Sequence, residues 1–334
     1  MYDVGICICI KTAHADRRLV PRVRIQQIST LNPHTAKLTR MTILITAATG
    51  RTSTYVIKAL LSDKAIEPSQ LRLLVRSQAA IERVKAKFPE LQPSCFVIGD
   101  YLEASSLPPA LEGVDLVFYN GPPFTPLETA MGIAMIEAAK NAGVKHFVFC
   151  SVLHPLLTKL LNHRSKLYVE EHLIESGLNY TILQPTSLMQ NFDLQNVIKS
   201  SVIPAPYSSK TLQGFLDLED LAVVARDVIL NPTLHNRARY ELVGENITLE
   251  EVAKTIGRVA NLPALKCEEV PRAKVAESGA IPTKALSEYA KEGLDRMLYY
   301  YDRRGIPGNN NVARWLLGRE PTNWESYARR ELHK

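Results

Sequence analysis

Short apolar strand patterns alternate with helix patterns from Met41 onward, and this alternation constrains the fold more than any other feature. Strand-like runs occur at 42–47, 71–76, 95–99, 115–120, 146–152 and 180–185. The longer helix-like segments between them cover 54–62, 78–88, 127–143 and 166–177. Strands separated by such helices form βαβ units, and strands that are apolar throughout suit a sheet covered on both faces. We therefore predict an α/β fold with a Rossmann doubly wound parallel sheet.

The rhythm changes after residue 186. Strand-like runs at 213–218 and 238–244 alternate with helix-like segments at 219–231 and 249–262, and a long helical pattern covers 281–305. Thr248 and Glu251 have the spacing of a capping box, which predicts a helix start there. We expect a Rossmann domain over 41–186. A smaller α/β C-terminal substrate-binding region should follow over 187–334, partly interleaved with the first domain.

The net charge of +6 is concentrated in the first 40 residues. Seven of the 40 Lys and Arg residues and two of the 34 Asp and Glu residues lie there, so residues 41–334 carry a net charge of only +1. A nearly neutral body offers little general attraction to nucleic acid. Residues 1–40 show no clear helix or strand period. We interpret them as a disordered N-terminal extension, with an organelle transit peptide as the alternative.

The cysteines and the apolar runs indicate the class of protein. Five cysteines without paired spacing indicate reduced thiols rather than disulfides or a zinc site; they are Cys7, Cys9, Cys95, Cys150 and Cys267. No apolar run has the length that spans a bilayer. We therefore expect a cytoplasmic protein that holds no metal and acts on a small-molecule substrate, with neither nucleic acid nor membrane as a partner.

The segment TAATGRTS at 46–53 links the first strand to the first helix, where dinucleotide-binding folds hold a pyrophosphate. The usual loop has three glycines, whereas these positions hold Ala47, Gly50 and Ser53. We expect Gly50 to leave room for the phosphates, while Ala and Ser are small enough for the flanking positions. Further donors are expected from the backbone amides of Arg51–Ser53 and from the hydroxyls of Thr49, Thr52 and Ser53. The alternative is a glycine turn in a fold that binds nothing.

The end of the second strand indicates which cofactor this loop would hold. In NAD sites an acidic residue at this place binds the ribose 2′-hydroxyl, but here the strand ends in Arg76 and Ser77. A guanidinium suits a 2′-phosphate, so we predict NADP(H), with NAD(H) as the alternative. The competing interpretation is that Arg76 is a solvated arginine at a strand end.

Several segments resemble the NmrA-like family of atypical short-chain dehydrogenase/reductase proteins, which are related to isoflavone-reductase-like enzymes and abundant in fungi. They are TILITAATGRTS, VIGDYLEASSLPPALEGVDLVFYNGPP, AAKNAGVKHFVFCSV, SKLYVEEHLIESGLNYTILQPTSLMQNF and YELVGENITLEEVAKTIGRV. The match runs in order from Met41 to the terminal LLGREPTNWESYARREL and does not cover residues 1–40.

The resemblance implies a role for several positions. The Gly50 loop would hold the pyrophosphate, and Arg76 would lie at the adenosine ribose. The other expected cofactor contacts are Asp100 and Tyr101 at the adenine, Asn120, Gly121 and Pro122 at the nicotinamide ribose, and Pro185 and Thr186 at the nicotinamide amide. Substrate would be bound by Phe192, with Met189 and Asn191 beside it.

The catalytic residues of typical short-chain dehydrogenases are only partly present. Those enzymes use Ser, Tyr and Lys, where Tyr-x-x-x-Lys places phenol and ammonium on one helical face. Here Ser151 ends the fifth strand and Lys166 occupies the lysine position, but Asn162 replaces the tyrosine. We expect Ser151 and Lys166 to contact the cofactor, and Lys166 is the candidate proton donor. The alternative is a surface lysine paired with Glu170 at i+4.

Other candidate groups are weaker. His154 and His163 lie near the expected cleft and titrate near neutral pH, but each also fits a structural histidine. Cys150 has apolar neighbours, which predicts a buried, inert thiol. The tyrosines 299–301 follow a helix and are expected to pack rather than to stack on bases.

Two classes of function fit these patterns. The first is an NADP(H)-dependent oxidoreductase that reduces an imine, conjugated alkene or carbonyl group, a chemistry that fungal relatives use in secondary-metabolite pathways. Imines and alkenes depend less on a tyrosine acid, so they suit Asn162 better. The second is a non-catalytic NAD(P)-sensing regulator that binds a protein partner, which Asn162 and the missing glycines favour. Lys166 and the C-terminal region favour the enzyme. A non-redox use of the fold, such as isomerisation, is a third alternative.

Overall fold

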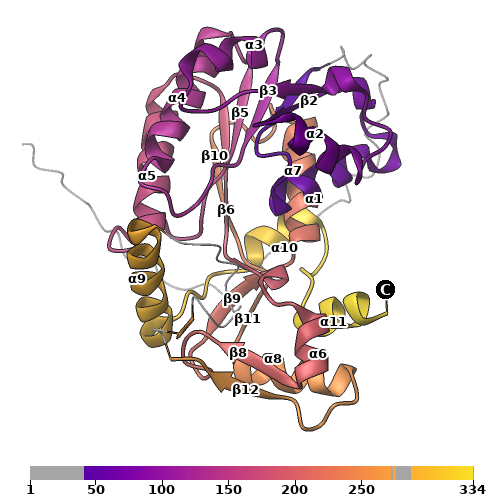
Figure 1. Cartoon of the computed structure of the whole chain (residues 1–334), viewed down its shortest axis with the longest axis vertical. Helices are drawn as coiled ribbons and strands as arrows, with labels where there is room; N and C mark the ends of the chain where they lie inside the picture. The colour runs from indigo at the N-terminus through magenta and orange to yellow at the C-terminus, as the bar shows by residue number, and fades with distance from the viewer. Residues whose placement is uncertain (1–40, 272–273, 276–286, 334) are drawn as a thin grey trace, which may run out of the picture. The chain divides into compact units, whose positions relative to one another are not determined.

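A seven-stranded parallel sheet forms the centre of the computed structural model, which describes residues 41–271, 274–275 and 287–333. The proposed extension at 1–40 and the start of the predicted helix at 281–286 lie outside these residues. The strand order is β10-β6-β5-β4-β1-β2-β3 (Figure 1). The strands are β1 Ile43–Ile45, β2 Leu71–Val75, β3 Phe96–Ile98, β4 Leu116–Tyr119, β5 His146–Cys150, β6 Tyr180–Pro185 and β10 Ala238–Leu242. This order, with every pair parallel, confirms the predicted Rossmann fold.

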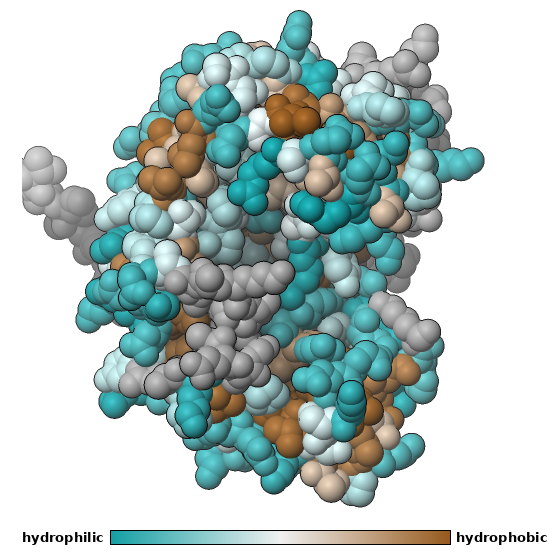
Figure 2. Space-filling view, viewed as in Figure 1, coloured by the Kyte–Doolittle hydropathy of each residue, from teal (hydrophilic) through white to brown (hydrophobic). Residues whose placement is uncertain are grey.

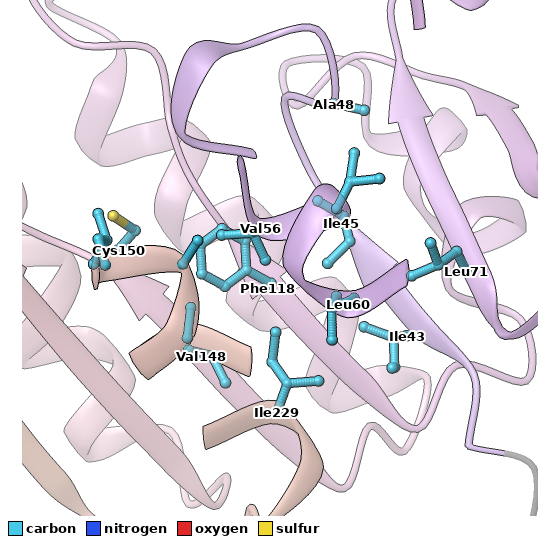
Figure 3. Packing of buried hydrophobic residues seen from close by; sticks show 14 of the residues in the cluster. Ile43, Ile45, Ala48, Val56, Leu60, Leu71, Phe118, Val148, Cys150 and Ile229 are labelled. Atoms are coloured by element: carbon cyan, nitrogen blue, oxygen red, sulfur yellow. The ribbon is translucent and has the colours of Figure 1, made fainter. Parts of the chain in front are cut away.

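Helices cover both faces of this sheet because alternate strand residues point to opposite sides. In β1, Ile43 and Ile45 join one hydrophobic core and Leu44 joins the other. Figure 3 shows the first core, where Val56 and Leu60 of α1 and Ile229 of α7 pack against the strands. The helices on that side are α1 Arg51–Leu61, α2 Gln78–Lys85 and α7 Leu218–Leu230. Those on the other side are α3 Leu107–Leu111, α4 Glu128–Asn141 and α5 Leu161–Glu175.

The residues after 186 form smaller sheets beside the carboxyl ends of the large one and share elements with it. A three-stranded sheet has the order β11-β9-β7, and β12 pairs with β8. These strands are β7 Ser187–Leu188, β8 Val202–Ala205, β9 Gln213–Leu216, β11 Glu245–Ile247 and β12 Lys266–Glu269. Their helices are α6 Leu194–Ser200, α8 Leu249–Val259, α9 Glu288–Arg304, α10 Asn311–Leu317 and α11 Trp324–Leu332. Although α7 and β10 follow residue 186, they pack into the Rossmann layer.

Short 3-10 turns complete the described chain at Ser62–Lys64, Pro68–Gln70, Pro93–Cys95, Ala104–Ser106 and Met189–Asn191. The predicted capping box is confirmed: Thr248 accepts from the Glu251 amide, and the Glu251 side chain accepts from the Thr248 amide. α5 begins at Leu161, five residues before the predicted start, and no side chain caps it. A helix start without a capping residue leaves no local signal, so the sequence pattern missed it.

Candidate functional site

A cleft of about 1120 Å³ opens at the carboxyl ends of the parallel strands. Loops that follow β1 to β6 all contribute to its wall, as expected where the strand order reverses in a doubly wound sheet. Its other wall comes from residues after 186, including β7, α6 and α9. Figure 2 shows a hollow between the part of the molecule that holds the large sheet and the part that holds the small ones.

The loop before α1 has the geometry of an anion-binding turn. Gly50 N donates to Ala47 O at 2.7 Å, and Ala47 has φ of 46°, the left-handed region that usually favours glycine. α1 begins at Arg51 with no side-chain cap and no acidic residue in its first turn, so its leading amides are left without a side-chain partner. A helix start of this kind fits a phosphate. The loop therefore suits the pyrophosphate of a dinucleotide.

The structure corrects one detail of this loop and adds another. Thr49, Gly50, Arg51 and Thr52 border the cleft, whereas Ser53 is fully buried and its hydroxyl donates to Thr46 O at 2.8 Å. Ser53 fastens α1 to the end of β1 and offers no hydroxyl to a ligand. A Cβ added at Gly50 would lie 2.9 Å from Ala47 O, so the loop's own backbone already excludes it. This clash adds to the one with the phosphates that the sequence predicts.

The expected adenosine side of the cleft carries two guanidinium groups. Arg76 borders it and makes no hydrogen bond or ion pair with the described residues, and Arg83 of α2 borders it as well. Asp100 also borders the cleft, but its carboxylate accepts from the Leu102 amide at 2.9 Å within its own turn. The Tyr101 ring packs edge-on against Tyr119, and burial raises the pKa of the Tyr101 phenol. Arg83 was missed because no local pattern distinguishes it from a solvated helix arginine.

The residues expected near the nicotinamide come together from three loops. Asn120, Gly121 and Pro122 border the cleft after β4, and the backbone N–H of Asn120 donates to Thr46 Oγ1 at 2.8 Å. Pro185 and Thr186 border it at the end of β6. The Thr186 hydroxyl donates to Gly214 O at 3.1 Å.

Ser151 borders the cleft, but its hydroxyl is bound to a buried carboxylate. It donates to Glu170 Oε1 at 2.5 Å, and Gln184 Nε2 donates to both Glu170 oxygens at 2.9 Å. Burial raises the pKa of Glu170, and the hydrogen bonds from Gln184 and Ser151 oppose that shift. Ser151 is therefore positioned by Glu170, the residue that we considered as a partner for Lys166.

Lys166 borders the cleft and is paired with Glu128 of α4, not with Glu170. The side chains of Lys166 and Glu128 are 11% and 3% exposed, and the second Glu128 oxygen has no partner among the described residues. Gly132 makes this pair possible: a Cβ there would lie 2.5 Å from Val169, so only glycine lets α4 and α5 approach so closely. Glu128 lies one turn before Gly132 and so reaches Lys166. Sequence reasoning missed Glu128 because its partner lies on another helix.

Asn162, His163 and Cys150 are not arranged as proton donors. Asn162 is 8% exposed, does not border the cleft and contacts Met297 Sδ through Nδ2 at 3.8 Å. Burial lowers the pKa of His163 to about 4 and raises the pKa of the Cys150 thiol to about 11. His154 does not border the cleft; its Nε2 lies 3.1 Å from Pro307 O. These positions confirm that Cys150 is a buried thiol.

The far end of the cleft is an apolar chamber. Asn191 and Phe192 border it, as the resemblance implied, but Met189 does not: it is fully buried in the second hydrophobic core. The aromatic and aliphatic wall includes Phe124, Tyr207, Leu294, Met297, Leu298 and Tyr301. Tyr301 is 6% exposed and Tyr299 is 45% exposed, so only the former packs in the core. Four wall residues belong to α9, whose place over the chamber the sequence did not indicate.

The described residues include neither a metal-ligand cluster nor a membrane-spanning helix. No group of three or more His, Cys, Asp or Glu residues is placed to hold a metal ion there. None of the helices with described coordinates has the length and apolar character needed to cross a bilayer.

Known proteins resemble this chain over most of its length. An NAD(P)H azoreductase of Xenophilus azovorans is 29% identical over 225 residues, which cover 66% of this chain and 74% of the relative. An agroclavine dehydrogenase of Claviceps fusiformis is 25% identical over 298 residues, covering 86% and 96%.

Two solved structures share the fold. The NADPH complex of an Escherichia coli quinone oxidoreductase has a TM-score of 0.72 at 23% identity and covers 87% of this chain and 100% of its own. NmrA, a negative transcriptional regulator in complex with NAD, has a TM-score of 0.68 at 19% identity, covering 87% and 95%. The family model described as "NmrA-like family" matches residues 39–328. The protein therefore belongs to the NmrA-like family.

Proposed function

We propose that the protein is an NADP(H)-dependent oxidoreductase that reduces an imine, a conjugated alkene or a carbonyl group of a small, largely apolar substrate. One observation carries this proposal: a single cleft joins an anion-binding loop and two arginines at one end to an apolar chamber at the other. Lys166 is the only lysine of the described chain that borders this cleft. Relatives named as an azoreductase, a dehydrogenase and a quinone oxidoreductase support this class.

The chain's own residues would bind the cofactor and exclude water. The loop at Gly50 would hold the pyrophosphate, and Arg76 with Arg83 would bind the 2′-phosphate, because guanidinium matches phosphate in charge and geometry. Bound NADPH would supply the hydride. Lys166, which Glu128 holds in place, would donate to the nicotinamide ribose hydroxyls and is the candidate proton donor to the substrate. Met189 and Ser53 have no part in this proposal.

The chamber favours reducible groups that need little help from a side-chain acid. Asn162, at the usual tyrosine position, faces Met297 instead of the cleft. Tyr207 and Tyr301 border the chamber, but burial raises the pKa of both phenols above the usual range. We therefore rank imines and conjugated alkenes, including quinones, ahead of simple carbonyls. On the family resemblance we add a place in fungal secondary metabolism, which accumulation of an unreduced precursor after gene deletion would support.

The test is a fluorescence titration with NADPH and NADH, followed by NADPH oxidation against a panel of imines, enones and quinones. Arg76→Ala should weaken NADPH binding by about ten-fold or more, since a hydrogen bond to a charged group contributes about 1.5–3 kcal/mol, and should leave NADH binding nearly unchanged. Arg258→Ala is the matched control, because Arg258 pairs with Glu325 away from the cleft. Equal losses for both nucleotides would show that Arg76 is structural, and absence of any binding would overturn the proposal.

A second candidate is a dinucleotide-sensing regulator that binds a protein partner without turnover. The specific observation in its favour is that Ser151 is bound to Glu170 and that Asn162 replaces the tyrosine acid. The structural likeness to the regulator NmrA is compatible with it. Lys166→Ala separates the two candidates, because an enzyme loses turnover that a sensor never shows.

A further inference from the structure

Arg51 connects the two walls of the cleft. It is the first residue of α1, and its Nη1 donates to Gln190 O at 2.6 Å while its Nη2 donates to Asn191 Oδ1. Both Arg51 and Asn191 border the cleft. The contact therefore joins the proposed phosphate loop to the segment that leads into the substrate chamber.

The segment that accepts these hydrogen bonds is held in place at Gln190 and borders the chamber at Asn191 and Phe192. Gln190 Nε2 donates to Asp217 Oδ1 at 2.6 Å, and Gln190 Oε1 accepts from the Leu218 amide at 3.1 Å. The next residues, Asn191 and Phe192, line the chamber. Phe192 packs edge-on against Trp324, with ring centroids 5.5 Å apart. Arg51 thus binds directly to Asn191 of the chamber wall and to Gln190 beside it.

The present partners of Arg51 are neutral. They are a backbone carbonyl and a side-chain amide, and the titratable groups recorded beside the guanidinium are the phenols of Tyr55 and Tyr327. A phosphate oxygen carries charge, so it adds a Coulomb attraction to the guanidinium that a neutral carbonyl or amide oxygen lacks, and it can accept in a bidentate geometry. A phosphate anion at the start of α1 would therefore compete successfully for this guanidinium.

We propose that Arg51 is a positioning residue that couples cofactor binding to the substrate wall. Without cofactor it holds residues 190 and 191 against α1. A bound dinucleotide phosphate draws the guanidinium away and releases the segment that carries Asn191 and Phe192, so the shape of the chamber wall depends on whether the cofactor is bound. This inference rests on the proposed dinucleotide site.

Hydrogen exchange of the backbone amides of residues 190–193 tests the coupling, with dinucleotide binding measured separately by calorimetry. Saturating NADP⁺ should speed exchange in this segment by roughly ten-fold, the factor that corresponds to losing one hydrogen bond to a charged group. Arg51→Gln should show the faster exchange without cofactor and no further change with it. Arg51→Lys, which keeps the charge but not the fork of donors, should lie between the two. Arg258→Gln should respond as the unchanged protein does.

Comparing NAD⁺ with NADP⁺ distinguishes the pyrophosphate from the 2′-phosphate as the competitor for Arg51. The same measurements distinguish failure of the coupling from failure of the proposed function. If NAD⁺ acts as NADP⁺ does, the pyrophosphate is the competitor; if only NADP⁺ acts, it is the 2′-phosphate. Either result supports the coupling. Dinucleotide binding without a change in the 190–193 amides would overturn the coupling and leave the proposed function intact. Failure of both dinucleotides to bind would overturn both proposals.

Discussion

Replacing Lys166 should destabilise the protein far more than replacing its partner Glu128. Both side chains are buried as an ion pair, but they differ in what surrounds them. Lys166 borders a large cleft, so its ammonium can turn to water when the carboxylate is removed. Glu128 is 3% exposed, and one of its oxygens already lacks a partner among the described residues. The two single substitutions are therefore not equivalent.

The surroundings set the expected magnitudes. Lys166→Met keeps the length of the stem but leaves an uncompensated buried carboxylate, and breaking such a pair costs about 3–5 kcal/mol of unfolding free energy. Glu128→Gln loses a charged hydrogen bond but strands no charge away from water, and should cost about 1–2 kcal/mol. In the Lys166→Met background the same Glu128→Gln change removes the stranded charge. There it should stabilise the protein by about 2 kcal/mol or more.

Urea unfolding of the four proteins, compared by midpoint at unchanged slope, measures these differences. Glu137→Gln is the control on the same helix, since Glu137 is half-exposed, pairs with His172 and should change stability by less than about 1 kcal/mol. The reasoning is refuted if Glu128→Gln destabilises both backgrounds by the same amount. That result would mean that Lys166 and Glu128 do not interact in solution.

Three further substitutions test other parts of the structure. Ala47→Gly should stabilise the protein by about 0.5–1 kcal/mol, because Ala47 has φ of 46°; a lower melting temperature would contradict this. Gly132→Ala should destabilise by about 1–3 kcal/mol, because its Cβ would meet Val169 at 2.5 Å, and adding Val169→Ala should restore part of the loss. The pKa of His146 and that of His163 are lowered by burial to about 4, so the unfolded chain binds protons first as the pH falls. Stability should therefore decline from about pH 6.5 towards pH 4, and less steeply in His163→Gln; equal slopes in acid-unfolding curves would exclude His163 as a cause.

The sequence by itself determined the sheet, the helices around it and the position of the loop at Gly50. These features depend on local patterns: apolar runs of strand length, helical periodicity and the capping box at Thr248 are written within a few consecutive residues. Burial was also readable from these patterns, as Cys150 shows. For the same reason the sequence placed Thr49, Gly50 and Arg76 at one end of the sheet, where the structure has them.

Only the tertiary structure decided which side chains meet. Lys166 had Glu170 one turn away, yet it pairs with Glu128 because Gly132 lets a second helix approach. Arg51 binds Asn191, which lies 140 positions further along the chain. Residues of α9 line the chamber, although no local sequence pattern indicates this. A periodic pattern states that a residue is buried or exposed but carries no information about its partner. The partner is fixed when distant segments pack, and that depends on the shape of every side chain between them.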